Sequence, residues 1–320
     1  MRRVFPLILF LSALASSVAN AQTSRAATAS SYLERGNNWY AKGEVEKALA
    51  DFDLAIASDP TFAGAWINRG LARLSRGELT EALSDLNRAI QLDPRRAETY
   101  VDRAWIWHLQ GDWDQVIGDN TSAIDLNSRL AEAWSNRGLA RAMKGDLDGA
   151  LADLNRALNL NPGLAKTWDN RAGVKYLKED WDGAISDATR AIKLDPRFVQ
   201  AWSDRGAAKH AKGNIDGALA DHNRAIELNS GMAEAYYNRA MAWEAKGDLA
   251  KALADFDRAI QLNRRWASAY AQRGLVHLRQ GNEAEAQQDF NQCLALNREL
   301  KPFLELRIRE AREKLLHPIH

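Results

Sequence analysis

The chain has 320 residues, with 43 basic and 42 acidic side chains and a formal net charge of +1 at pH 7. This balance lacks the one-sided charge expected of a nucleic-acid-binding protein or of an acidic tail. Its length would ordinarily suggest about two globular domains, but internal repeats override that expectation, so periodicity has to be tested first.

Residues 1–21 have the pattern of a signal peptide. Arg2 and Arg3 precede an apolar segment over residues 4–15, and a small-residue stretch ends at Ala21. We expect cleavage after Ala21, with residues 22–28 as a linker; a retained membrane anchor is the alternative, although the apolar segment is short for a bilayer. The leader predicts a periplasmic or secreted protein of a Gram-negative bacterium. Cleavage removes two arginines and leaves a formal charge of −1, so no membrane insertion or docking of the mature chain is expected.

Two columns of residues recur every 34 positions between residues 29 and 300. The first is aromatic in every unit, and the second, four residues later, is glycine or alanine. The aromatic column is Tyr32, Trp66, Tyr100, Trp134, Trp168, Trp202, Tyr236 and Tyr270, and the small column is Gly36, Gly70, Ala104, Gly138, Ala172, Gly206, Ala240 and Gly274. Residues four apart share one face of a helix, where the small residue permits close approach of a second helix and the ring fills the space beside it.

The rest of each unit predicts a turn and a second helix. A glycine stands eleven residues after the ring in all units except one, where Glu179 replaces it, and an alanine column follows, broken only by Val116. Residues after the glycine, such as Asp112, Asp146 and Asn282, suit the N-cap of the second helix. A further small column ends in Cys293, the only cysteine, which we interpret as a packing residue and not a nucleophile.

This unit resembles the tetratricopeptide repeat. Residues 63–96 carry the resemblance most fully, through Trp66, Gly70, Ala82, Leu86, Ala89 and Pro94. The resemblance covers residues 29–300 and implies an all-α fold, a right-handed α-solenoid of eight 34-residue helix-turn-helix repeats. Residues 301–320 are similar to the C-terminal capping helix and tail of such arrays. The expected buried stripe of that helix is Leu304, Ile308, Ala311 and Leu315.

An arginine column and an aspartate column depart from the family pattern. Arginine precedes the small residue in every unit, from Arg35 to Arg273, and aspartate follows each arginine by 16 residues, from Asp51 to Asp289. We expect the two columns to pair, either within a hairpin or between neighbouring hairpins. Because every unit repeats the arrangement, we interpret it as a set of structural ion pairs and not as a catalytic carboxylate array.

The resemblance implies that the first helices line a concave groove, which is the candidate binding site. The column before the arginine is rich in amides, which can donate to and accept from an extended peptide backbone; a solvated polar face is the alternative. Trp105 and Tyr237 are candidate anchors, with packing as the alternative. The expected peptide-binding residues are Asn68, Asp102, Trp105, Asn136, Asn170, Asp204, Tyr237 and Asn238.

No constellation of residues indicates catalysis. The six histidines form no H-E-x-x-H motif, and His317 and His320, the one close pair, are interpreted as a frayed tail and not as a metal site. His222 stands in a packing column and is interpreted as a packing histidine. There is no P-loop or dinucleotide-binding motif, so no cofactor, no catalytic residue and no metal is implied.

Two functions fit this pattern. The first is a protein–protein interaction scaffold, not an enzyme, that binds a protein or peptide in its groove and no nucleic acid. The alternative is a structural subunit of an envelope complex, or an adaptor that positions a separate enzyme. Four departures from the repeat, Gly118, Asn120, Glu179 and Ala188, predict soft points in the array.

Overall fold

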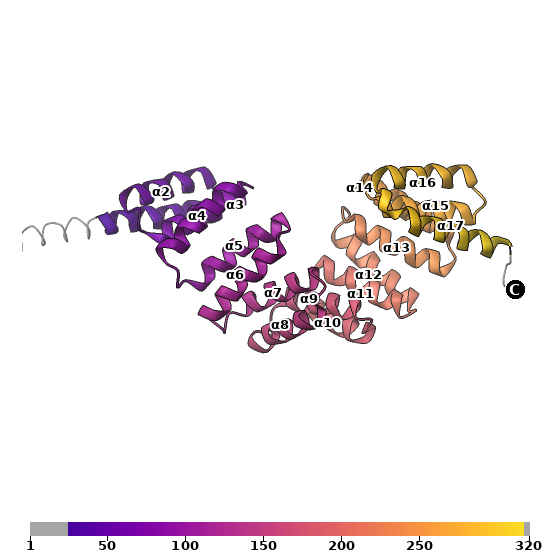
Figure 1. Ribbon diagram of the computed structural model, residues 1–320, viewed down its shortest axis with the longest axis horizontal. Helices are drawn as coiled ribbons and strands as arrows, with labels where there is room; N and C mark the ends of the chain where they lie inside the picture. The colour runs from indigo at the N-terminus through magenta and orange to yellow at the C-terminus, as the bar shows by residue number, and fades with distance from the viewer. Residues whose placement is uncertain (1–24, 317–320) are drawn as a thin grey trace, which may run out of the picture. The chain divides into compact units, whose positions relative to one another are not determined.

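The computed structural model describes residues 25–316 of the chain, and the expected signal sequence and the final histidine pair lie outside that range. All regular structure in the described part is helical (Figure 1). A helix is already formed over residues 25–41, so residues 25–28 of the expected linker are helical. No helix among the described residues is both long enough and apolar enough to cross a bilayer.

The chain divides into two compact units, residues 1–160 and residues 161–320. In its described part, the first unit consists of four helical hairpins and the second of four hairpins followed by a terminal helix. The first unit contains the helix over residues 25–41, α2 (Val45–Ser58), α3 (Ala63–Ser75), α4 (Leu79–Leu92), α5 (Ala97–Gln110), α6 (Trp113–Leu126), α7 (Ala131–Met143) and α8 (Leu147–Leu160). The second contains α9 (Ala165–Leu177), α10 (Trp181–Leu194), α11 (Val199–Ala211), α12 (Ile215–Leu228), α13 (Ala233–Lys246), α14 (Leu249–Leu262), α15 (Ala267–Arg279), α16 (Glu283–Leu296), the short 3₁₀ turn η1 (Arg298–Leu300) and α17 (Lys301–Leu316). The sequence-based prediction of an all-helical solenoid of hairpins is confirmed.

The turn inside each hairpin depends on a left-handed residue. The glycine column adopts φ values from 76° to 86°, a conformation that costs a side-chain-bearing residue about 1–2 kcal/mol. Glu179 takes the same conformation, with φ of 60°. The predicted N-caps differ in outcome. Asp112 and Asp146 accept backbone hydrogen bonds from the first turn of α6 and α8, whereas Asn282 stands at the start of α16 and makes no such bond.

Close packing inside each hairpin explains the small column. A β-carbon added at Gly138 would lie 2.9 Å from Cγ of Leu154 and 3.1 Å from the carbonyl oxygen of Ala150. The first helix therefore approaches the second more closely than a larger residue would allow. Cys293 is fully buried in the last hairpin and His222 in the sixth, so both are packing residues as the sequence predicts.

The arginine and aspartate columns pair inside each hairpin. In all eight hairpins Nε of the arginine donates to one carboxylate oxygen and Nη2 to the other, as in Arg137–Asp153 at 2.8 and 3.0 Å. The aspartate side chains are at most 9 % exposed. In at least six of the hairpins Nη1 also donates to the second helix of the preceding hairpin, for example from Arg69 to Asp53 at 2.6 Å. Each of these arginines thus fixes the geometry within a hairpin and the register between hairpins.

Three departures from the repeat lie in second helices. A β-carbon at Gly118 would meet no other group, so this glycine serves no close contact. Asn120 is fully buried; its Nδ2 donates to the carbonyl oxygen of Val116 at 2.8 Å, while its Oδ1 has no hydrogen-bond partner among the described residues. Ala188 is also fully buried, in a column that holds leucine or phenylalanine in five of the eight hairpins.

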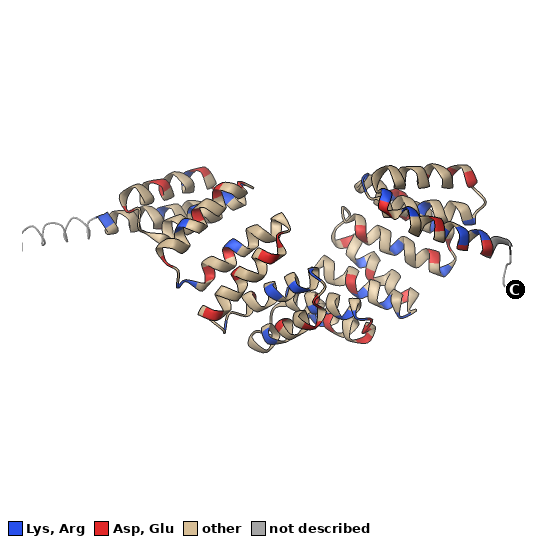
Figure 2. Cartoon of the chain, viewed as in Figure 1, with Lys and Arg blue, Asp and Glu red and all other residues tan. Residues whose placement is uncertain are grey.

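Helix α17 covers the last hairpin. Leu304 is 2 % exposed and Ala311 is also buried. Both belong to one cluster with Leu275 and Phe290 of the last hairpin, and Ile308 packs against this cluster. The expected buried stripe is confirmed for these residues, while the side chain of Leu315 lies outside the described part. Along the helices of both units, Lys and Arg positions are interspersed with Asp and Glu positions (Figure 2).

Candidate functional site

The first helices of successive hairpins touch one another and form a layer in each unit. In the first unit α3 contacts α5, and α5 contacts α7; in the second unit α11 contacts both α9 and α13. We call the surface of this layer that carries the column before the arginine the inner face. The second helices provide the opposite layer, so the inner face is built from first helices alone.

The expected peptide-binding column lies on the inner face and is partly exposed at every position from Asn68 to Asn238. Two of its amides already have partners from the neighbouring hairpin. Nδ2 of Asn68 donates to Oδ1 of Asn37 at 2.6 Å, and Nδ2 of Asn238 donates to Oγ of Ser203 at 3.4 Å. Asn136 and Asn170 are also only partly exposed. The column therefore presents polar groups held in place by neighbouring helices.

The two candidate anchors have different surroundings. Trp105 is 39 % exposed and stacks on His108, with ring centroids 4.8 Å apart, while His108 meets the edge of Trp113. An exposed indole on a stacked support is suited to contact a partner. Tyr237 stacks on Trp266 at 4.6 Å and is partly buried, so much of its ring contributes to packing.

Three carboxylates in this layer lie in surroundings that disfavour their charge. Burial, together with the nearby carboxylate of Glu132, raises the pKa of Asp102 to about 6. Burial and the charge of Asp204 raise the pKa of Asp169 to about 8. Burial raises the pKa of Asp204 to about 7, and Glu234 adds to the effect.

Asp169 is the functional candidate that the sequence analysis misses. It occupies the column directly after the aromatic ring, which holds Ile67, Val101, Ser135 and Ser203 in other hairpins, and it is only 5 % exposed. An aspartate at a buried position of an otherwise apolar or hydroxyl-bearing column is the signal that could have identified it. Its Oδ1 has no hydrogen-bond partner among the described residues.

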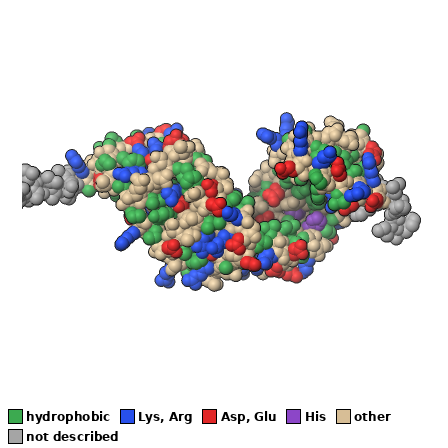
Figure 3. Space-filling view, in the orientation of Figure 1, with side chains coloured by type: hydrophobic (Ala, Val, Ile, Leu, Met, Phe, Trp, Pro, Cys, Tyr) green, Lys and Arg blue, Asp and Glu red, His purple; other side chains and the backbone are tan. Residues whose placement is uncertain are grey.

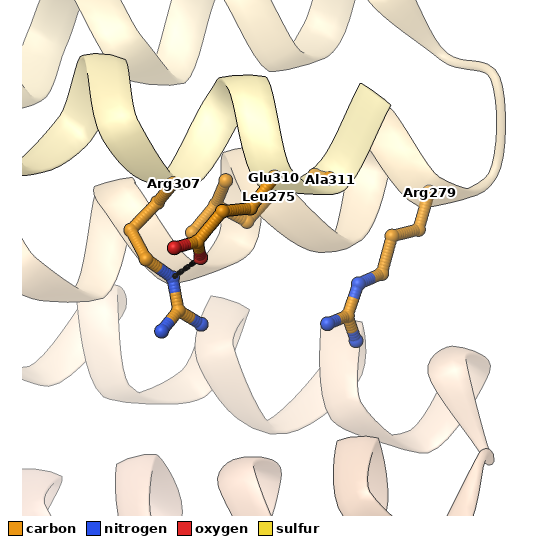
Figure 4. A pocket seen from close by; sticks show the side chains of 5 residues that line it. All are labelled: Leu275, Arg279, Arg307, Glu310 and Ala311. Atoms are coloured by element: carbon orange, nitrogen blue, oxygen red, sulfur yellow. Dashed lines mark ion pairs between the residues drawn. The ribbon is translucent and has the colours of Figure 1, made fainter. Parts of the chain in front are cut away.

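A small pocket lies between α15 and α17 and is lined by Leu275, Arg279, Arg307, Glu310 and Ala311 (Figure 4). Nε of Arg307 lies 3.7 Å from Oε2 of Glu310, and Nη1 of Arg279 binds Glu244 at 2.6 Å. Both guanidinium groups therefore have carboxylate partners. The pocket is a product of capping by α17 and offers no unpaired charge to a ligand.

Within the described part of the chain, no three histidine, cysteine, aspartate or glutamate side chains gather as a metal site would require. The face in Figure 3 shows hydrophobic, basic and acidic side chains interspersed over each unit. The inner face, with its polar column and its buried carboxylates, is thus the candidate site.

The chain matches known proteins at the level of its repeats. Three family models described as tetratricopeptide repeat match it, over residues 131–164 and 233–265, residues 33–98, 67–117 and 176–232, and residues 267–300. No curated protein sequence matches the chain significantly.

Two solved structures illustrate the similarity of fold. A tetratricopeptide repeat protein from Parabacteroides merdae is 21 % identical, with a TM-score of 0.62 over 77 % of this chain and 98 % of the other. The anaphase-promoting complex hetero-tetramer Cut9–Hcn1 contains a chain that is 14 % identical, with a TM-score of 0.69 over 88 % of this chain and 55 % of the other. The hairpin geometry and the family matches, which together cover more than half of the sequence, show that this chain belongs to the tetratricopeptide repeat family.

Proposed function

We propose that the protein is an interaction scaffold that holds an extended polypeptide along the inner face of its first helices. The observation that carries the proposal is the partly exposed polar column, which recurs in the six hairpins from Asn68 to Asn238 on first helices that contact one another. Amides at 34-residue intervals provide donors and acceptors for a peptide backbone, which supplies affinity without reading side chains. Tetratricopeptide repeat proteins generally act as non-catalytic interaction modules, in keeping with this role.

Replacement of Asn136, Asn170 and Asn238 by alanine tests the proposal. Partner capture from an envelope extract, with photo-crosslinkers at Trp105, is expected to fall in this triple variant while helical content stays the same. The matched control replaces three exposed amides of second helices, Gln91, Gln261 and Asn291, by alanine. Equal capture by both triple variants would reject the inner face and favour a structural subunit that assembles through its second helices.

We also propose that the protein is exported to the periplasm or secreted. Arg2, Arg3 and the small residues before position 22 support this, because they follow the order of a signal peptide. The test is expression of the full chain in a Gram-negative host, followed by fractionation and intact mass measurement. A mature chain that begins at Gln22 in the periplasmic fraction is expected. A chain that keeps its first 21 residues and stays in the cytoplasm would contradict export.

A further inference from the structure

A pair of carboxylates lies on two neighbouring first helices of the second unit. Asp169 belongs to α9 and Asp204 to α11, helices that contact each other. Asp169 is 5 % exposed and its Oδ1 has neither solvent contact nor a hydrogen-bond partner. Asp204 is partly exposed, so the pair remains accessible from the inner face, and its Oδ1 accepts a hydrogen bond from Nε2 of Gln200 at 2.8 Å. A buried carboxylate oxygen without a partner is costly, and such a group calls for a ligand.

Four cations of the same two helices bind other carboxylates. On α9, Arg171 and Lys175 both bind Asp187, each at 2.7 Å. On α11, Arg205 and Lys209 both bind Asp221, also at 2.7 Å. These four cations all turn toward the second helices, away from the Asp169–Asp204 pair. These four cations therefore do not serve as counter-charges for the Asp169–Asp204 pair.

We propose that Asp169 and Asp204 bind a lysine or arginine side chain of an extended polypeptide on the inner face of the second unit. A basic side chain supplies both the missing positive charge and hydrogen-bond donors for the unpartnered oxygen. The inference rests on the proposed function, because the backbone of that polypeptide lies along the polar column. The column provides affinity and the carboxylate pair provides selectivity for a basic residue.

Binding of a cation to this pair releases protons. With the pKa of Asp169 at about 8 and that of Asp204 at about 7, the free pair carries bound protons near neutral pH. A lysine ammonium favours the ionised carboxylates and itself stays charged, so its affinity rises as the pH increases from 6 to 8. Burial lowers the pKa of His210, so this residue carries less positive charge near pH 6 than a fully solvated histidine would. The other charged groups on α9, α11 and α13 are Lys166, Arg171, Lys175, Arg205, Lys209, Glu234, Arg239, Glu244 and Lys246, and Asp187 and Asp221 of the second helices bind four of these cations.

The experiment uses end-blocked nine-residue peptides of glycine, serine and threonine with one variable central residue. Lysine, arginine, norleucine and glutamate are placed at the centre, and dissociation constants for the full chain are measured by fluorescence anisotropy at pH 6, 7 and 8. The double variant Asp169→Asn/Asp204→Asn is compared with Glu227→Gln/Glu285→Gln, which removes two exposed carboxylates from second helices. Both variants replace two carboxyl groups by amides, so the loss of negative charge is matched above pH 8, where the two aspartates are ionised, and the control loses more negative charge at lower pH.

The wild-type chain is expected to bind the lysine and arginine peptides about tenfold more tightly than the norleucine peptide at pH 8. This preference should shrink toward pH 6, disappear in the double asparagine variant and persist in the control. If all peptides bind equally to the wild type, the proposal is overturned while the proposed function stands. If none binds, both fail.

Two further results bear on the carboxylate pair itself. The proposal is overturned if the double asparagine variant still binds the lysine and arginine peptides more tightly than the norleucine peptide. It is also overturned if the wild-type chain binds Ca²⁺ through both aspartates but binds all peptides with equal affinity. If the double variant does not fold, as judged by circular dichroism, the proposal is tested with the single variant Asp204→Asn and with the pH dependence of peptide binding by the wild type. Lysine-peptide affinity that is flat between pH 6 and 8 then contradicts the proposal.

Discussion

His222 replaces the leucine or phenylalanine that fills the equivalent position in most other hairpins, and neither of its ring nitrogens has a hydrogen-bond partner among the described residues. Burial lowers its pKa from 6.5 to about 4. The unfolded chain therefore binds a proton below pH 6.5 that the folded chain does not bind until about pH 4. Above pH 6.5 the titration of His222 does not reduce the free energy of unfolding. As the pH falls from 6.5 toward 4, the free energy of unfolding decreases progressively, because the unfolded chain binds the proton and the folded chain does not.

The variant His222→Leu tests this residue. We expect it to protect the sixth hairpin at acidic pH, with a gain over the wild type that grows between pH 6.5 and pH 4 to about 3 kcal/mol. Leucine fits the site, because Gly206 faces His222 as Gly138 faces Leu154. Urea unfolding at pH 7 and pH 4.5 measures the difference between the two proteins. A difference that does not change with pH contradicts the titration argument, and Leu154→His should show the opposite trend.

Among the helical elements, the hairpin of α9 and α10 has the least favourable turn. Glu179 is the only non-glycine residue with a positive φ in the described part of the chain. We expect Glu179→Gly to raise the free energy of unfolding by about 1 kcal/mol, since glycine adopts this conformation without the steric cost of a β-carbon. The reciprocal variant Gly213→Glu, in the next hairpin, should lower it by a similar amount. Chemical denaturation measures both, and no change in either would show that the turn conformation is not limiting.

The buried ion pair of each hairpin is the second element to test. Asp153 is fully enclosed and contacts Arg137 and also Arg141 at 2.9 Å, so its removal leaves two guanidinium groups without their carboxylate. We expect Asp153→Ala to cost about 3–5 kcal/mol of unfolding free energy. Asp125→Ala, at an exposed position on α6, should cost about 0.5 kcal/mol or less. Thermal and urea unfolding measure the free energy of unfolding of the two variants. If both variants lose the same amount, the buried ion pair contributes no more to stability than an exposed charge.

A second variant separates pairing from burial. Replacement of both partners, Arg137→Met with Asp153→Leu, removes this pair together and should recover most of the loss, because the remaining cation, Arg141, is 29 % exposed and lies 3.8 Å from Asp146. If it does not, the contacts of Arg137 with Trp134 and with Thr121 carry the stability instead.

The sequence predicts those features that depend on size and periodicity. The hairpins, the glycine turns and the pairing of the arginine column with the aspartate column repeat in register, so each unit provides the same signal. Whether the ion pairs form within a hairpin or between hairpins does not follow from the sequence, because a separation of 16 residues is compatible with both. The Asp169–Asp204 pair was not predicted, since it arises from two different columns on adjacent hairpins and only the stacking of α9 on α11 brings them together.

Across the molecule, the stability of a repeat array is a sum of local and nearest-neighbour contributions. The effect of a destabilising substitution at one end should therefore decrease with distance from the substituted residue. Leu304 in α17 is 2 % exposed and packs on the last hairpin, whereas Leu306 in the same helix is 44 % exposed. We expect Leu304→Ala to cost about 2–5 kcal/mol locally, by loss of buried contacts and creation of a cavity. Hydrogen exchange should accelerate most in α15 and α16 and least in the helices of the first unit. Leu306→Ala should leave exchange nearly unchanged. Uniform acceleration in all hairpins after Leu304→Ala would instead mean that the chain unfolds as one cooperative unit, and the soft points expected at Gly118 and Glu179 would then have no local effect.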